Sequence, residues 1–61
     1  MKLDNYTLPE LYLIRREVES ELRDEPETDD RGLYDAWKRY NGPREDLSVK
    51  INERIEYLYS L

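Results

Sequence analysis

The chain has 61 residues, with fifteen Asp and Glu against ten Lys and Arg and a formal net charge of −5. A domain of this size buries only about 60% of the surface that its unfolded chain exposes, which leaves material for one thin hydrophobic layer and none for a deep catalytic cavity. Because the sequence contains no Cys and no His, it excludes disulfides, a zinc site, a thiol nucleophile and an imidazole base. We therefore expect no enzymatic activity, no metal, no cofactor and no small-molecule substrate.

Hydropathy argues against a membrane segment. The longest apolar run, residues 11–14, is far shorter than the roughly 20 residues needed to cross a bilayer, and residues 1–5 lack the apolar core of a signal peptide. We expect a cytoplasmic protein. The charged fraction of 41% and the mean hydropathy of −1.06 approach the composition of disordered chains, but six Tyr, one Trp and regularly spaced aliphatic residues favour folding.

A first helix is predicted over residues 8–24. Thr7 and Glu10 have the spacing of a capping box, and Pro9 falls in the first turn, where its missing N–H costs nothing. Pro26 is expected to close this helix, because it disfavours helical dihedrals at the preceding residue. One face is apolar at steps of three and four residues, and it consists of Leu8, Leu11, Ile14, Val18 and Leu22.

Two further helices are predicted, over residues 30–41 and 45–60. Thr28, Asp29 and Asp30 offer N-cap oxygens for the second helix, and Asn41-Gly42-Pro43 predicts its end, with Gly42 in the left-handed cap conformation. We expect Trp37 to be the central core residue of the fold. The two predicted apolar faces are Leu33, Ala36, Trp37 and Tyr40 in the second helix and Leu47, Ile51, Ile55 and Leu58 in the third.

These elements predict an all-α fold, a small three-helix bundle that forms a single helical domain over residues 1–61. Residues 1–6 are an N-terminal arm and residues 25–29 an acidic loop. A helical hairpin with a short middle helix is the alternative architecture. Because a single chain of this length has little core, a homodimer is a further option.

The negative charge is concentrated in one segment. Residues 17–30 contain eight acids and one base, Arg23, and thus carry −7, so the rest of the chain carries +2. A charged stretch of this kind is ordinarily a solvated face. The competing interpretation is an electronegative surface that binds a basic surface of a protein partner, since carboxylates on a rigid helix can stand in for a row of phosphates. The candidate contact residues are Leu13, Glu17, Glu21, Asp24 and Glu25.

The sequence therefore predicts a small non-enzymatic regulatory or inhibitory protein that acts on a nucleic-acid-binding protein. This combination is typical of host-takeover factors encoded by phages or mobile elements. A structural homo-oligomer is the first alternative, because apolar residues such as Leu13, Val49 and Tyr59 miss the predicted seams. A nucleic-acid-binding helical module is the second, and it is disfavoured because the Lys and Arg residues are spread over all three predicted helices.

Overall fold

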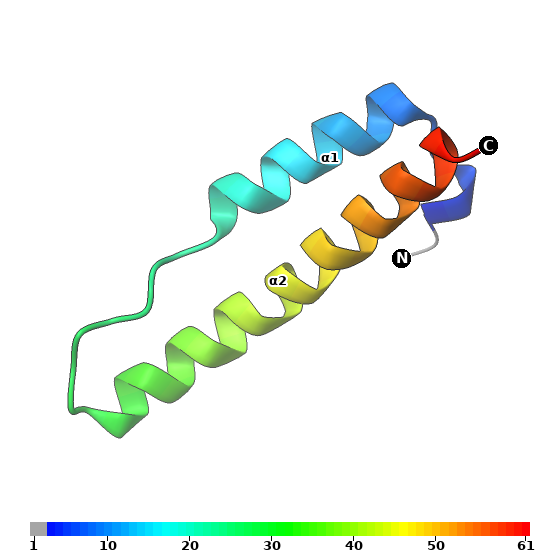
Figure 1. Cartoon of the computed structure of the whole chain (residues 1–61). Helices are drawn as coiled ribbons and strands as arrows, with labels where there is room; N and C mark the ends of the chain where they lie inside the picture. Colours follow the sequence, from blue (N-terminus) through cyan, green and yellow to red (C-terminus); the bar gives the residue numbers. More distant parts are fainter. Residues whose placement is uncertain (1–2) are drawn as a thin grey trace.

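The computed structural model describes residues 3–61 and shows a helical hairpin (Figure 1). It consists of a 3₁₀ turn η1 (Leu3–Asn5), helix α1 (Leu8–Glu21) and helix α2 (Arg31–Tyr59). Residues 22–30 form the loop between the two antiparallel helices, and η1 lies at the same end of the hairpin as the last turns of α2. The all-α prediction is confirmed, with no strand among the residues described. Residues 1 and 2 of the predicted N-terminal arm lie outside them.

The predicted second and third helices are one continuous helix. α2 runs for 29 residues through Asn41, Gly42 and Pro43, so the predicted helix end at these residues is wrong. Gly42 does not adopt a positive φ and is not a left-handed cap. The fold is therefore a two-helix hairpin with no separate short middle helix. Neither α1 nor α2 has a stretch that is long and apolar enough to cross a membrane.

Pro43 lies inside α2, where proline ordinarily costs about 3 kcal/mol because it removes one hydrogen bond and crowds the carbonyl four residues earlier. One local feature reduces this cost. Gly42 has no Cβ to clash with the proline ring, so the usual restriction on the residue before proline is relieved. The carbonyl that loses its helical donor is that of Arg39, four residues before Pro43.

The start of α1 has the predicted capping box. The Glu10 carboxylate accepts from the Thr7 amide at 3.0 Å, and the Thr7 hydroxyl accepts from the Glu10 amide at 3.4 Å. The hydrogen bond from the Thr7 amide is the main reason that the pKa of Glu10 lies below its ordinary value. Two donors at the helix start are thereby satisfied, as the sequence predicts.

The end of α1 lies at Glu21, not at residue 24 as predicted. Leu22 is already extended, and the next residue, Arg23, bonds to α2 through both of its backbone groups. The Arg23 amide donates to the Asn41 side-chain oxygen at 2.7 Å, and the Trp37 indole N–H donates to the Arg23 carbonyl at 2.9 Å. These tertiary bonds, and not the distant Pro26, end the helix.

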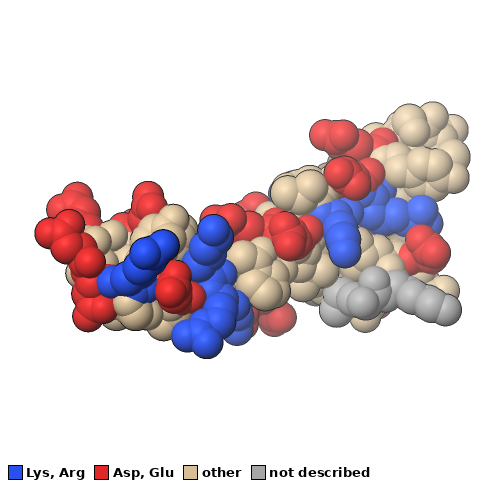
Figure 2. Space-filling view, turned by 90° about the horizontal axis from the view of Figure 1, so that it is seen from below, with Lys and Arg blue, Asp and Glu red and all other residues tan. Residues whose placement is uncertain are grey.

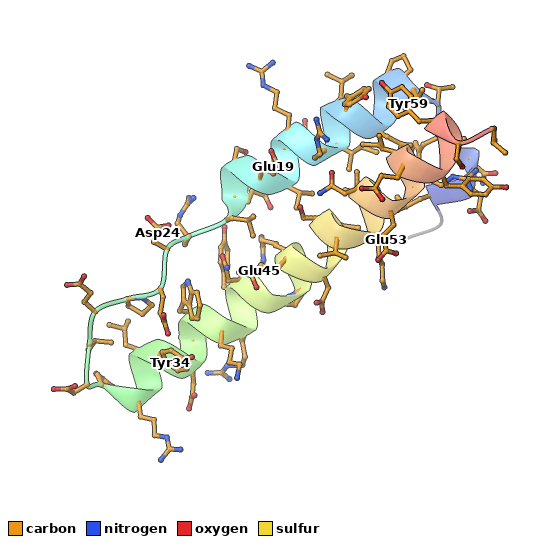
Figure 3. All side chains as sticks on the ribbon, in the orientation of Figure 1. Glu19, Asp24, Tyr34, Glu45, Glu53 and Tyr59 are labelled. Atoms are coloured by element: carbon orange, nitrogen blue, oxygen red, sulfur yellow. The ribbon has the colours of Figure 1, made fainter. Side chains whose placement is uncertain are left out.

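The hydrophobic core occupies one half of the hairpin. It is formed by α1, η1 and the C-terminal half of α2, and its buried members are Leu3, Leu11, Val18, Ile51 and Ile55. The predicted apolar faces of the first and third helices are thus confirmed, except for Leu22, which lies past the end of α1 and outside this core. At the end of this half, the hydroxyl groups of Tyr12 and Tyr59 are hydrogen-bonded and join the start of α1 to the last turn of α2 (Figure 3).

The other half of α2 has no helix packed against it. At 1.5 Å per residue α2 is about 43 Å long and α1 about 21 Å, so α1 ends before it reaches the first turns of α2. Leu33 is 53% exposed and Trp37 is only half-buried. The prediction that Trp37 is the central core residue is therefore wrong, because the loop and not a helix lies beside it.

The hairpin exposes more surface than a compact protein of its mass. A folded monomer of 7.5 kDa is expected to expose about 4,250 Å², whereas this chain exposes 5067 Å², an excess of about 800 Å². The excess is consistent with the elongated shape, 46 Å long and 17 by 15 Å across. Much of α2 is therefore available for contact with another molecule.

We predict that Pro43→Ala stabilises the protein by about 1–3 kcal/mol, because alanine restores the missing helical hydrogen bond in a continuous α2. Urea unfolding followed by circular dichroism measures the change. Pro26→Ala, a substitution in the loop, is the matched control and should not stabilise the protein. If Pro43→Ala left the stability unchanged or lowered it, α2 would be broken at this residue.

Candidate functional site

Asn41 holds the loop against α2. Its side chain is only 3% exposed, and it accepts from the Arg23 amide while its own amide group donates to the Glu45 carboxylate at 2.7 Å. A buried amide side chain is stable only when its polar atoms have partners, and both the oxygen and the nitrogen of Asn41 have one. Together with the Trp37 bond to the Arg23 carbonyl, this interaction fixes the beginning of the loop.

The far end of the loop is fixed by the start of α2. The Asp30 carboxylate accepts from the amides of Gly32 at 2.9 Å and Leu33 at 3.3 Å, which confirms Asp30 as an N-cap. The Thr28 hydroxyl accepts from the Asp30 amide at 3.0 Å. Because both ends of the loop are hydrogen-bonded, its nine residues are held along α2 without regular secondary structure of their own.

The structure separates the predicted contact residues. Leu13 and Glu17 are exposed on α1, whereas Asp24 and Glu25 are exposed on the loop, beyond the end of the helix that carries Glu19 (Figure 3). The predicted first helix, residues 8–24, includes Asp24, which the structure places on the loop instead. Glu21, the fifth predicted residue, pairs with Arg44 of α2 at 3.0 Å.

Most acids of residues 17–30 have no ion-pair partner. Within residues 3–61, Glu21 is the only one of them in a salt bridge. Arg23, the one base of this stretch, donates to the carbonyls of Ser20 and Leu22 at the end of α1, where positive charge is favoured. We call the exposed, unpaired acids the acidic surface: Glu17, Glu19, Asp24, Glu25, Glu27 and Asp29.

Acidic side chains are dense at the loop end of the molecule, and others lie along its length and at the opposite end (Figure 2). Figure 2 shows red side chains gathered at the end formed by the loop and the start of α2, with Lys and Arg side chains of the hairpin beside them. Lys38 and Arg39 are exposed in the N-terminal half of α2, away from both of its ends. They line a separate open hollow together with Asp35.

An open apolar groove lies between the loop and α2, and sequence analysis missed it. Its volume is about 420 Å³. The regular spacing of the apolar residues 33–40 predicts a core face covered by a third helix, and no such helix covers it in the structure. We call this feature the loop groove; it is lined by Arg23, Asp24, Pro26, Leu33, Ala36, Trp37 and Tyr40.

The acidic surface and the loop groove adjoin each other, since Asp24 belongs to both. Among residues 3–61, no three acidic side chains converge in a way that could hold a metal ion. Comparisons with protein-family models, curated proteins and solved structures found no match for this chain. The candidate site is accordingly defined by its geometry: exposed carboxylates of α1 and the loop next to an open apolar groove.

We predict that Asn41→Ala destabilises the protein by about 1–3 kcal/mol, because the Arg23 amide loses its acceptor in a buried place. It should also release the loop and move the emission of Trp37 to longer wavelength. Asn52→Ala, on the same helix, is the control, since Asn52 is less buried and accepts a single bond from Arg15 at 3.2 Å. If Asn41→Ala and Asn52→Ala lowered the stability equally, and Asn41→Ala left the emission of Trp37 unchanged, then Asn41 would not hold the loop.

Proposed function

We propose that this chain is a small non-enzymatic regulatory or inhibitory protein that binds a basic surface of a protein partner through its acidic surface. One observation carries the proposal: six exposed carboxylates of residues 17–29 lack ion pairs within the described chain, on a helix end and a loop that are both fixed. Fixed charges of one sign attract a partner of opposite sign and accelerate its association.

The partner that we propose is a protein that normally binds nucleic acid. Such a protein has a basic face shaped for a row of phosphates, and carboxylates held at fixed positions can occupy that face in their place. Occupation would block access of the nucleic acid and so inhibit or redirect the partner. The cytoplasmic location predicted from the sequence fits this role and stays a prediction.

The exposed area supports binding in general. The elongated hairpin exposes about 800 Å² more surface than a compact monomer of its mass, and this surface is available for contact. An elongated hairpin with a thin core buries less of its surface than a compact fold does, and it exposes more surface for contact. This area argument applies to any protein partner, and the charge is what favours a basic one.

A structural homo-oligomer is the second candidate function. It is favoured by exposed apolar side chains outside the loop groove, namely Leu13, Val49, Tyr57 and Tyr59. In that function the acids would only keep the assembly soluble. Sedimentation at micromolar concentration distinguishes the two: we expect a folded monomer, and a stable dimer or larger assembly would favour the oligomer.

We predict that reversal of three charges, Glu17→Lys, Asp24→Lys and Glu25→Lys, abolishes capture of a basic partner from a lysate of the source organism. The control reverses three acids of α2 far from the loop, Asp46→Lys, Glu53→Lys and Glu56→Lys, which gives the same net charge. Glu21 is left unchanged because it pairs with Arg44. Capture should be lost only in the first variant and should weaken with salt.

The proposal would be wrong if the first variant captured the same partner with equal affinity at low salt. Loss of capture in both variants would also contradict it, because net charge and not the acidic surface would then be responsible. Circular dichroism of each variant establishes that the helices are retained.

A further inference from the structure

We infer that the loop groove receives an apolar side chain of a basic, amphipathic peptide segment, so that the carboxylates beside the groove bind the Lys and Arg residues that flank this side chain. This inference rests on the proposed function and deepens it. It assigns the partner two chemical properties, a positive charge and an apolar anchor, where the acidic surface alone requires only the first.

The exposed lining of the groove is mostly apolar, and the indole N–H of its largest side chain, Trp37, already has a hydrogen-bond partner. The Trp37 indole N–H donates to the Arg23 carbonyl, so the ring can contact a ligand without leaving a polar atom unpaired. The Tyr34 ring packs at 5.5 Å from the Trp37 ring and supports it from the side. Leu33, half-exposed, completes an apolar wall that an incoming aliphatic or aromatic side chain would remove from water.

The groove is formed before any ligand binds. Asn41 fixes the loop at Arg23, and Asp30 fixes it at the start of α2. A surface that is already ordered loses little conformational entropy on binding, which favours affinity. The volume of about 420 Å³ is near the lower end for ligand pockets, which suits a side chain or two and not a folded domain.

Charge decides which occupant fits. Arg23 and Asp24 both line the groove and offset each other in formal charge, but residues 23–30 together contain five acids and one base, a charge of −4 beside the groove. A second copy of this chain placed symmetrically on the groove would bring together two segments of residues 17–30, each with a charge of −7, and they would repel. A phosphate backbone would be repelled in the same way. A basic segment is attracted, so charge and apolarity together favour a basic amphipathic peptide.

The test selects binders from a displayed library of short random peptides on the whole chain. We expect the enriched peptides to combine Lys or Arg with one apolar anchor. Trp37 is the only Trp of the chain, so its emission should change when a Trp-free synthetic copy of an enriched peptide binds. Replacement of the anchor by Ser should weaken binding by about tenfold to a hundredfold, the effect of losing one buried apolar side chain.

A matched pair of variants locates the site. Leu33→Ser changes the groove, and Val49→Ser changes an apolar residue of similar exposure elsewhere on α2, 53% against 55%. We expect Leu33→Ser to weaken peptide binding by about tenfold and Val49→Ser to leave it unchanged. Both residues are half-exposed, so neither substitution removes a buried part of the core.

The outcomes separate this inference from the function on which it rests. Enrichment of basic peptides without an anchor, bound equally by Leu33→Ser, would overturn the groove as the site and leave the proposed function standing. Selection that enriches no basic peptide would overturn both. A change in Trp37 emission with the concentration of the protein alone would show that a second copy occupies the groove, and would also overturn the inference.

Discussion

The bond from the Arg23 amide to the buried side chain of Asn41 determines how the rest of the chain is arranged. It ends α1 at Glu21, well short of the far end of α2, and directs the following residues along the exposed half of the long helix. The Trp37 indole bonds the carbonyl of the same residue, so a single residue of the loop is held from both sides. The loop groove and the position of Asp24 beside it both follow from this constraint.

The hairpin divides into two halves with different roles. In one half, α1, η1 and the end of α2 bury Leu11 and Ile51 completely and supply the stability of the fold. In the other half, the first turns of α2 are covered only by an acidic loop and keep an apolar face open to solvent. A chain of 61 residues has too little apolar material to fill both halves, and the unfilled half provides the surface that we propose for binding.

The sequence predicted the features that depend on neighbouring residues. The capping box at Thr7, the N-cap at Asp30 and the apolar faces of the packed half are all local patterns, and the structure confirms them. The exposure of Leu13 and Glu17 followed from helical periodicity in the same way. The end of α1 could not be predicted, because it depends on Asn41, eighteen residues further along the chain than Arg23. Asp24 lies on the loop and not on the first helix for the same reason.

The sequence also indicates that α2 is continuous. This indication is stronger than the local pattern Asn41-Gly42-Pro43, which predicts a helix end. Tyr40 and Leu47 are seven residues apart, two helical turns, so the apolar faces on either side of Pro43 keep the same phase. If residues 30–41 and 45–60 were two separate helices, their apolar faces would not need to share one helical phase. The most direct measurement is therefore the Cα chemical shift of residues 39–45 by NMR. The account predicts helical shifts through Asn41, Gly42 and Arg44, and random-coil or left-handed values at Gly42 would contradict it.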